Sequence, residues 1–400
     1  MRVAITPSRA CGTVSAPPSK SMAHRALICA ALSGGSTVVN VALSRDIEVT
    51  LDCLEKLGTN ISYDNGTFTL GGLDPSKIPD GCEIYCHESG STLRFLIPLC
   101  MLAKGHVTLS GAPRLMERPQ TVYEELAKEL QIDFLKRDGK IIVGGGLCAG
   151  DFSVRGDVSS QFITGLLIAL STLPQKSTLH VTGKFESASY TDLTISALTH
   201  FGKDATRRDR VFTILPSSFK KTCYRVEGDY SNSAYLDALS VIGGEVEVTG
   251  LLESSLQGDA VYRDFFKKMK EGFNTFDISG CPDNAPILFA LAAVLNGAEF
   301  TGTSRLKIKE SDRAEAMKCE LAKLGAHVTV EENRVVVPKT EITPPASPIS
   351  SHNDHRIAMA MAVLLTLTGG EIEGAEAVTK SFPDFWDKLQ ELQIGLKIYA

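Results

Sequence analysis

The stretch Ile61-Ser62-Tyr63-Asp64-Asn65-Gly66-Thr67-Phe68-Thr69-Leu70 decides the fold, because it is one copy of a pattern that recurs along the chain. Two short runs of strand-forming residues flank Asp64-Asn65-Gly66, a turn sequence that is typical of a β-hairpin. A similar stretch, His327–Val337, places two Val-rich runs on either side of Glu331-Glu332-Asn333. Each predicted hairpin follows a predicted helix, which indicates a repeating unit that ends in a hairpin.

Helix boundaries recur at a nearly constant interval. Helix-start signals lie near Lys20, Gly90, Ser160, Asn232, Asn284 and Asp354, and second helices end near Leu57, Leu130, Phe201, Met269, Leu324 and Leu392. By subtraction, successive starts are 70, 70, 72, 52 and 70 positions apart, and each second helix ends 37 to 41 residues after its own start. A β-rich run such as Ser36–Val41 lies between the two helices. The pattern predicts six copies of an α-β-α-β-β unit, or βαβαββ when the strand before each helix is counted.

Six units of this size exceed what one core holds, so we expect an α/β protein with two domains of three units each. The segment Lys220–Arg225 lies between units three and four and is the preferred crossover. The predicted first domain is 15–225, and the predicted second domain combines 1–14 with 226–400. The strand expected at Arg2–Ile5 precedes unit one and fits either domain.

Composition narrows the class of protein. The chain has 400 residues, 43% hydrophobic and 22% charged, with a formal net charge of −6. An acidic balance argues against a general nucleic-acid binder, so any anion site must be local. The longest uncharged apolar run, Ile357–Leu367, is too short to span a bilayer. Ten cysteines without paired metal-ligand spacing indicate reduced thiols, so we expect a cytoplasmic protein without a membrane segment.

The most informative charged motif is Lys309-Glu310-Ser311-Asp312-Arg313. It precedes an apolar-periodic run that predicts a helix, and cations are disfavoured at the positive end of a helix dipole. Two cations at such a place indicate an anion held between them, whereas the alternative is a solvated charged first turn. Since Lys309 and Arg313 are four residues apart, we expect them on one face of the helix.

Other predicted helix starts carry similar groups. Pro17–Arg25 places Ser19, Ser21, Lys20 and Arg25 around free backbone N–H groups, which favours a phosphate or carboxylate cradle over a plain N-cap. The GxxxxGK[ST] loop of nucleotide-binding proteins is missing from this segment.

Units two and three begin with small hydrogen-bonding residues. Gly90 permits close backbone approach to a ligand, and Ser159-Ser160-Gln161 suits a phosphate that nearby cations already balance. An ordinary N-cap is the alternative at both places. Arg118-Pro119 is expected to begin another helix.

Together these motifs form one constellation. It contains seven cations and two carboxylates: Lys20, Arg25, Arg118, Lys309, Arg313, Arg356 and Lys380, with Asp283 and Glu310. A metal at His352 and His355 lacks a supporting spacing. The constellation predicts an enzyme that acts on polyanionic small molecules through proton transfers, without a metal or cofactor.

At these residues the chain resembles the 5-enolpyruvylshikimate-3-phosphate synthase family of enolpyruvyl transferases. The resemblance is carried in order by Ser19-Lys20-Ser21 with Arg25, Gly90-Ser91 with Arg94, Glu117-Arg118-Pro119, Ser159-Ser160-Gln161, Lys309–Arg313, Asn353-Asp354-His355-Arg356 and Lys380–Asp384. It implies a two-domain inverse α/β barrel, with three βαβαββ units per domain and a site that closes between them. It also implies that the first strand belongs to the second domain.

The resemblance further implies transfer of the enolpyruvyl group of phosphoenolpyruvate to the 5-hydroxyl of shikimate 3-phosphate, on the pathway to chorismate and aromatic amino acids. The implied catalytic residues are Asp283, Glu310 and Lys20. The implied contacts of shikimate 3-phosphate are Lys20, Ser21, Arg25, Ser159, Ser160, Ser187, Tyr190, Asp283 and Lys309, and those of phosphoenolpyruvate are Lys20, Gly90, Arg118, Gln161, Arg313, Arg356 and Lys380. The resemblance implies no cofactor, no nucleic acid and no membrane, a monomer, and glyphosate as an inhibitor.

Two positions depart from the sequence pattern of the family, and three other classes of protein are alternatives to this interpretation. The family's commoner Asn-Ala-Gly-Thr reads Glu88-Ser89-Gly90-Ser91 here, which places a carboxylate beside the enolpyruvyl site, and Arg305 stands where some members have Asn. UDP-N-acetylglucosamine enolpyruvyltransferase typically has Lys-Asn in place of Lys20-Ser21 and a catalytic Cys loop. RNA 3′-terminal phosphate cyclase has related units but fits the acidic balance poorly. A non-catalytic polyanion-binding module would need neither carboxylate.

Overall fold

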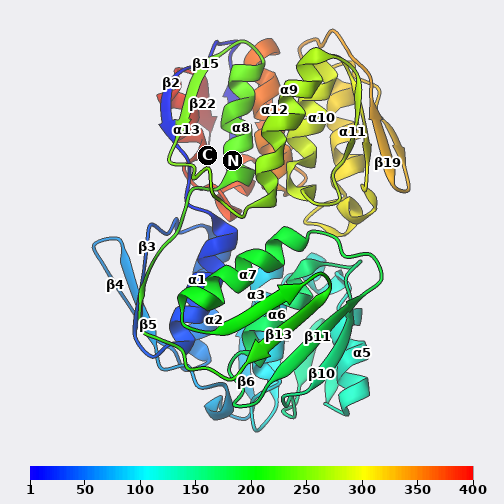
Figure 1. The fold of residues 1–400 in the computed structure, drawn as a ribbon. Coiled ribbons are helices and arrows are strands. Elements are labelled where there is room, and N and C mark those ends of the chain that lie inside the picture. The colour runs from blue at the N-terminus through cyan, green and yellow to red at the C-terminus, as the bar shows by residue number, and fades with distance from the viewer. Residues whose placement is uncertain (400) are drawn as a thin grey trace. The chain divides into compact units, whose positions relative to one another are not determined.

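The computed structural model describes residues 1–399, and the chain forms two compact units (Figure 1). One unit combines Met1–Ser19 with Gly228–Ala400, and the other is Lys20–Glu227. The predicted domains differ from these units by five residues at the first crossover and by two at the second.

Three four-stranded sheets of one design make up the β structure of the unit Lys20–Glu227. In each sheet the first two strands are parallel and a hairpin completes it in antiparallel fashion. The strand orders are β14(Cys223–Arg225)-β3(Ser36–Val39)-β5(Thr67–Gly71)-β4(Asn60–Asp64), β6(Cys82–Tyr85)-β7(Val107–Ser110)-β9(Lys140–Val143)-β8(Phe134–Arg137) and β10(Asp151–Arg155)-β11(Ser177–Thr182)-β13(Val211–Leu215)-β12(Asp204–Arg208). The hairpin predicted at Ile61–Leu70 is confirmed, with Tyr63 opposite Phe68.

Helices of two kinds accompany these sheets. They are α1(Lys20–Leu32), α2(Arg45–Lys56), α3(Gly90–Cys100), α4(Pro113–Glu117), α5(Thr121–Leu130), α6(Ser160–Leu170) and α7(Ala188–His200), with the 3-10 turn η1(Pro75–Lys77). The first helix of each repeat is mostly apolar and buried on nearly all sides, and ten of the eleven residues of both α3 and α6 are buried. A helix that is hydrophobic all round must lie inside, whereas α2 and α5 keep one charged face outward.

The unit that contains both chain termini repeats this design with changes. Its strand orders are β16(Asn274–Asp277)-β17(Ala298–Thr301)-β19(Arg334–Val337)-β18(Thr329–Glu331), β20(Ile349–Ser350)-β21(Gly370–Glu373)-β1(Arg2–Ile5)-β22(Leu396–Tyr399) and β15(Glu245–Thr249)-β2(Cys11–Ser15). The last sheet has two strands because no hairpin follows the second helix of repeat four. The prediction of six complete βαβαββ units is therefore wrong for this repeat, and the missing hairpin explains the short interval of 52 residues.

Its helices are α8(Tyr230–Val241), α9(Tyr262–Glu271), α10(Ala285–Val294), α11(Arg313–Lys323), α12(His355–Thr368) and α13(Phe385–Glu391), with the 3-10 turns η2(Gly258–Val261), η3(Pro282–Asn284), η4(Ser304–Ile308) and η5(Ala375–Lys380). Helices α8, α10 and α12 contact one another (Figure 1), and α12 buries twelve consecutive residues, His355–Thr366. Helices lie inside and sheets outside in each unit, which confirms the predicted inverse α/β barrel of repeated βαβ units.

Two strands lie in a different repeat from the one that their position in the sequence suggests. Strand β2 precedes α1 but pairs with β15 of repeat four, and β14 precedes α8 but pairs with β3 of repeat one. Strand β1 completes the sheet of repeat six by pairing with β21 and β22. The N-terminal segment thus closes the unit that also holds the C-terminus.

Candidate active site

A cluster of charged side chains lies at the helix starts of the unit Gly228–Ala400. Asp283 follows Pro282 in the turn η3, where the proline fixes the backbone before α10 begins. Its Oδ1 accepts hydrogen bonds from Lys309 Nζ at 3.1 Å and from Arg313 Nη1 at 2.6 Å. Arg313 also donates from Nη2 to Glu310 Oε2 at 2.9 Å. The two predicted catalytic carboxylates of this unit therefore share one guanidinium.

Lys309 and Arg313 do not lie on one helix face, so that prediction is wrong. Lys309 ends the turn η4 in an extended conformation, and α11 begins only at Arg313. Asp312 caps the helix by accepting from the N–H of Glu315, since a short carboxylate satisfies a free amide there. The two cations meet through Asp283 because the chain bends between them.

Arg313 is 1% exposed and is held chiefly by Asp354, which is fully buried. Arg313 Nε donates to Asp354 Oδ2 at 2.9 Å, and Ser311 Oγ donates to the same oxygen at 3.0 Å. The other oxygen of Asp354 accepts from the backbone N–H of Arg356 at 2.9 Å and so caps α12. One carboxylate thereby fixes both a helix start and the arginine beside it.

The electrostatics of this cluster keep Asp283 ionised. Burial by itself raises the pKa of Asp283, but the charges of Lys309, Arg313 and Arg356 outweigh it and hold that pKa well below 3.8. Burial lowers the pKa of Lys309, partly offset by Asp283. Burial also disfavours charge on Arg313, yet Asp354, Glu310 and Asp283 raise its pKa, so it stays protonated.

Arg356 and Lys380 are the other predicted cations of this unit. Arg356 Nη2 lies 3.8 Å from Asp283 Oδ2, and its Nη1 donates to the carbonyl of Ser231 at 3.0 Å. Its Nε is buried without a hydrogen-bond partner within residues 1–399. Lys380 Nζ donates to the carbonyl and side-chain oxygens of Asn353, at 2.6 and 2.7 Å. Arg356 therefore adjoins the carboxylate cluster, whereas Lys380 is anchored on the loop that precedes α12.

In the unit Lys20–Glu227, the predicted groups begin at the start of α1. Lys20 is the first residue of that helix, and its Nζ forms an ion pair with Asp46 Oδ2 at 2.8 Å. Both side chains are about 15% exposed. Lys20 is thus a partly buried cation whose ammonium group is held by Asp46, in contrast to a solvated surface lysine.

Arg25 lies one turn further along α1 and is 2% exposed. Four of its five N–H groups have partners, namely the carbonyls of Ser21 and Tyr190 and the hydroxyls of Thr164 and Thr194. Burial lowers the pKa of Arg25 to about 10, so it remains a cation at neutral pH. The side chain joins α1 to α6 and α7.

Gly90 and Arg118 lie against each other. A Cβ atom added at Gly90 would lie 2.6 Å from Arg118 Nη1, so any side chain there would displace this guanidinium. Arg118 does not begin a helix as predicted: it follows the end of α4, and α5 begins at Thr121. The next residue is Pro119, and a residue before proline adopts an extended conformation, as Arg118 does here.

The start of α6 brings the third repeat to this region. Ser159 caps the helix by accepting from the N–H of Gln161. Gln161 Nε2 donates to Ser91 Oγ at 3.0 Å, and its Oε1 accepts from Arg94 Nη1 at 2.8 Å. The amide of Gln161 is therefore oriented by both of its neighbours on α3.

Ser187 and Tyr190 lie at the start of α7. Ser187 precedes the helix with a positive φ of 54°, and Tyr190 offers its carbonyl to Arg25. The predicted residues divide between the two units. Those in Lys20–Glu227 are Lys20, Ser21, Arg25, Gly90, Arg118, Ser159, Ser160, Gln161, Ser187 and Tyr190. In Gly228–Ala400, one cluster comprises Asp283, Lys309, Glu310, Arg313 and Arg356, while Lys380 contacts Asn353.

Three supporting residues are not among the predicted site residues: Asp46, and also Arg94 and Asp354, which the sequence analysis names only as motif residues. Asp46 and Asp354 pair with predicted cations, and Arg94 orients Gln161. The N-cap position of Asp354 was a readable signal. Arg305, which was left out of the predicted site, is 8% exposed and donates to the carbonyl of Ser279.

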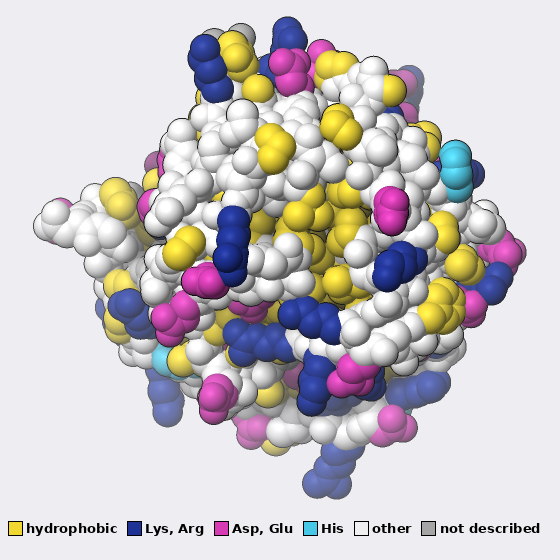
Figure 2. Space-filling view, turned by 90° about the horizontal axis from the view of Figure 1, so that it is seen from above, with side chains coloured by type: hydrophobic (Ala, Val, Ile, Leu, Met, Phe, Trp, Pro, Cys, Tyr) yellow, Lys and Arg dark blue, Asp and Glu magenta, His cyan; other side chains and the backbone are white. Residues whose placement is uncertain are grey.

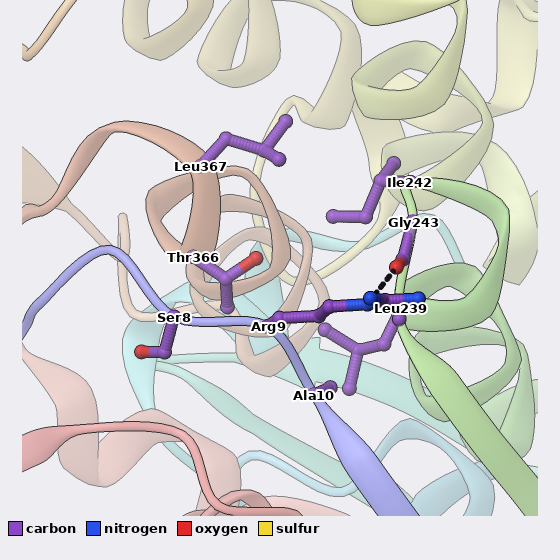
Figure 3. A pocket seen from close by; sticks show the side chains of 9 residues that line it. Ser8, Arg9, Ala10, Leu239, Ile242, Gly243, Thr366 and Leu367 are labelled. Carbon is purple, nitrogen blue, oxygen red and sulfur yellow. Dashed lines mark hydrogen bonds between the residues drawn. The ribbon is translucent and has the colours of Figure 1, made fainter.

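Apart from the predicted site residues, the unit Gly228–Ala400 contains a cavity of about 290 Å³ (Figure 3). The ends of α8 and α12 and the segment that precedes β2 line it, and Arg9 Nε donates to the carbonyl of Gly243 at 2.7 Å. It contains no predicted site residue. The face in Figure 2 shows an apolar area with charges of both signs around it.

Residues 1–399 lack two further features. No group of three or more His, Cys, Asp or Glu side chains is arranged to hold a metal ion. None of the helices there combines the length and hydrophobicity that a membrane span requires.

The chain is similar to known proteins over nearly its whole length. The chain matches the model of the EPSP synthase (3-phosphoshikimate 1-carboxyvinyltransferase) family over residues 5–389. It is 39% identical to the 3-phosphoshikimate 1-carboxyvinyltransferase of Clostridium kluyveri, over 98% of this chain and 97% of that protein. The corresponding protein of Clostridium acetobutylicum is 37% identical over the same shares.

A solved EPSP synthase of Acinetobacter baumannii shares the fold. Its TM-score is 0.77, with 20% identity and coverage of 99% of this chain and 100% of that chain. The family model and the two relatives each span nearly the whole length of this chain. The chain therefore belongs to the EPSP synthase family.

Proposed function

We propose that the protein transfers the enolpyruvyl group of phosphoenolpyruvate to the 5-hydroxyl of shikimate 3-phosphate, with release of phosphate. Family membership confirms the predicted enzyme and its place in the shikimate pathway, and it does not favour the nucleotide-sugar alternative. The observation that carries the chemistry is the ionised carboxylate of Asp283, held by Lys309 and Arg313 with Arg356 at 3.8 Å.

Asp283 is proposed as the base that takes the proton of the 5-hydroxyl while that oxygen attacks C2 of phosphoenolpyruvate. A carboxylate with so low a pKa is a weak base. Substrate anions bound to the same cations weaken the hold of those cations on the carboxylate, so its pKa rises when the site is loaded. The Asp283 carboxylate is therefore a weak base in the empty site and a stronger base when the substrates are bound.

Glu310 is proposed to move the proton of C3, and Lys20 to assist at the phosphate that leaves. Glu310 shares Arg313 with Asp283, and the guanidinium keeps the two carboxylates close without repulsion. In the first step C3 gains a proton as the new C2–O bond forms. In the second step the C2–O bond to phosphate breaks and C3 loses a proton, which restores the double bond.

Both substrates are anions, and each is proposed to contact cations and hydrogen-bond donors among the residues described above. Shikimate 3-phosphate is proposed to contact Lys20, Ser21, Arg25, Ser159, Ser160, Ser187, Tyr190, Asp283 and Lys309. Phosphoenolpyruvate is proposed to contact Lys20, Gly90, Arg118, Gln161, Arg313, Arg356 and Lys380. Helix N-termini at Lys20, Gly90 and Ser160 support both assignments, because their free N–H groups bind anions.

The test mixes protein, shikimate 3-phosphate and phosphoenolpyruvate in a chelated buffer and measures released phosphate. Release that requires both substrates is expected. Release that requires UDP-N-acetylglucosamine in place of shikimate 3-phosphate would contradict the proposal, and so would binding of both substrates without turnover.

Three further features belong to the proposal. We expect a cytoplasmic monomer, testable by sedimentation and cell fractionation. Glyphosate is expected to compete with phosphoenolpyruvate at the cations that bind it. Glu88 precedes Gly90 by two positions, so Glu88→Asn is expected to change glyphosate inhibition more than shikimate 3-phosphate affinity.

A further inference from the structure

A row of buried polar side chains joins the first three helices of the unit Lys20–Glu227. His24 Nδ1 lies 2.8 Å from Thr50 Oγ1, and Thr50 Oγ1 lies 2.6 Å from Thr92 Oγ1. Thr92 Oγ1 then donates to Ser89 Oγ at 2.7 Å. The four residues are at most 1% exposed and come from α1, α2 and the start of α3.

The buried position of His24 in this row affects its protonation. Burial, with the nearby charges of Lys20 and Arg25, lowers the pKa of His24 well below 6.5, so its ring is neutral. His24 Nδ1 pairs with the hydroxyl of Thr50, and the hydroxyl of Thr92 donates to Ser89. The single proton of the Thr50 hydroxyl is available either to Thr92 or to the backbone carbonyl of Asp46. Ser89 is the N-cap of α3, and it also accepts from the backbone N–H of Thr92.

Thr50 is the branch point of the row. Besides His24 and Thr92, its hydroxyl lies 3.1 Å from the backbone carbonyl of Asp46, one turn earlier in α2. Asp46 is the ion-pair partner of Lys20. Thr50 therefore contacts the residue that holds Lys20 and, through Thr92, the residue that precedes Gly90.

Burial of these polar groups lowers the stability of the folded protein relative to apolar side chains of similar shape. His24 Nε2 is buried without a hydrogen-bond partner within residues 1–399, and a well-packed apolar group would avoid that unsatisfied atom. A polar chain in such a place fixes geometry, because each hydrogen bond has a narrow range of length and angle.

We propose that Thr50 is a positioning residue that sets the placement of the Lys20 ammonium relative to the backbone N–H of Gly90, and hence the affinity for phosphoenolpyruvate. The inference rests on the proposed function, which assigns Gly90 to phosphoenolpyruvate alone and Lys20 to both substrates. Shikimate 3-phosphate is also assigned Arg25, Ser159 and Ser160, which are not members of the row, so its binding depends on the row less.

The experiment compares Thr50→Val, which keeps the shape and removes the hydroxyl, with Thr50→Ser, which keeps the hydroxyl. KM and kcat are measured for each substrate by phosphate release. Thr50→Val should raise the KM for phosphoenolpyruvate about tenfold, equivalent to one or two lost hydrogen bonds. The KM for shikimate 3-phosphate should stay within about twofold, and Thr50→Ser should restore the wild-type values.

Thr92→Val is the second variant, since it breaks the row beyond Thr50 and should also raise the KM for phosphoenolpyruvate selectively. If Thr50→Val does not fold, the KM values of Thr92→Val test the proposal in its place. The matched control is Thr366→Val, a buried helical threonine whose hydroxyl donates to the carbonyl of Val363. Its kinetics should equal those of the wild type.

The outcomes separate the two proposals. Wild-type protein that releases no phosphate would overturn the proposed function and the inference with it. Normal wild-type turnover overturns the inference alone if Thr50→Val changes both KM values equally, or if it lowers only the melting temperature. Failure of Thr50→Ser to restore the KM would likewise reject the role of the hydroxyl.

Discussion

Arg313 Nη1 lies 2.6 Å from Oδ1 of Asp283, so the residue predicted to bind a substrate carboxylate contacts the residue proposed as base. The same oxygen accepts from Lys309, which means that one atom of Asp283 faces two cations. A ligand anion that reaches Arg313 must compete with this contact. Substrate binding and the basicity of Asp283 are consequently linked.

Asp283→Asn should reduce kcat by about 10²–10⁴-fold with smaller changes in KM, because the amide keeps the shape of the side chain but cannot take a proton. Phosphate release with both substrates measures the effect. Asp277→Asn is the control, since Asp277 only accepts from the N–H of Ser279 near the surface. Near-normal turnover in Asp283→Asn would remove this residue from the mechanism.

Glu310→Gln should lower turnover and, more specifically, abolish exchange of the C3 hydrogens of phosphoenolpyruvate with solvent. The reason is that Gln cannot carry a proton to and from carbon, whereas it still accepts from Arg313. Deuterium incorporation followed by mass spectrometry measures the exchange. Glu315→Gln, at an exposed ion pair with Lys318, should exchange normally; wild-type exchange in Glu310→Gln would assign this step to another group.

Arg313→Ala should destabilise the protein by about 3–5 kcal/mol, because it leaves the buried Asp354 without its cation. From the sequence alone this change would be expected to weaken only ligand binding. Arg313→Lys should recover part of the stability but not the affinity for phosphoenolpyruvate, since an ammonium lacks the planar fork. Urea unfolding and calorimetric titration measure the two effects.

Arg334→Ala is the matched control for that change. Arg334 also contacts two carboxylates, Glu299 and Glu331, but its side chain is 42% exposed. Exposed ion pairs contribute little, so the midpoint of urea unfolding should barely move. Equal losses in Arg313→Ala and Arg334→Ala would show that the buried network contributes no more than a surface pair.

Gly90→Ala should weaken phosphoenolpyruvate binding, because the added methyl group displaces the guanidinium of Arg118. The expected rise in KM is about tenfold or more, with the fold retained, since alanine favours a helix start at least as well as glycine. Gly272→Ala is the control: nothing lies within 4 Å of its added Cβ, and its φ of 162° is extended. An unchanged KM in Gly90→Ala would show that Arg118 can move without cost.

The neutral His24 predicts a pH dependence of stability. Its pKa in the folded protein is lowered well below 6.5, so the unfolded chain binds the proton more readily. The contribution of His24 to the free energy of unfolding is complete above about pH 6.5. It is lost as the pH falls below that value, by up to about 1.4 kcal/mol per pH unit. Denaturant unfolding between pH 7.5 and 4.5 measures this slope.

His24→Gln should show a shallower slope in the same range, because it has no group to protonate. His180→Gln, at an exposed position of β11, should keep the wild-type slope. Parallel curves for wild type and His24→Gln would contradict the assignment of this pH dependence to the buried imidazole.

Much of the fold could be predicted because helix starts are local features. Capping residues and apolar runs placed the start of every first helix within two residues, for example at Lys20, Gly90 and Ser160. Strand pairing is not local, and so the exchange of β2 and β14 between repeats could not be predicted. The missing hairpin of repeat four appeared in the sequence only as a shortened interval.

For the site, the sequence by itself determined which charged and hydroxyl residues stand at helix starts, since each start exposes N–H groups that suit an anion. Only the tertiary structure decided how those residues meet. It placed Arg313 on Asp354, 41 positions away, and brought Thr50 between His24 and Thr92. Side-chain contacts of this kind depend on how separate helices pack, and no local pattern encodes that packing.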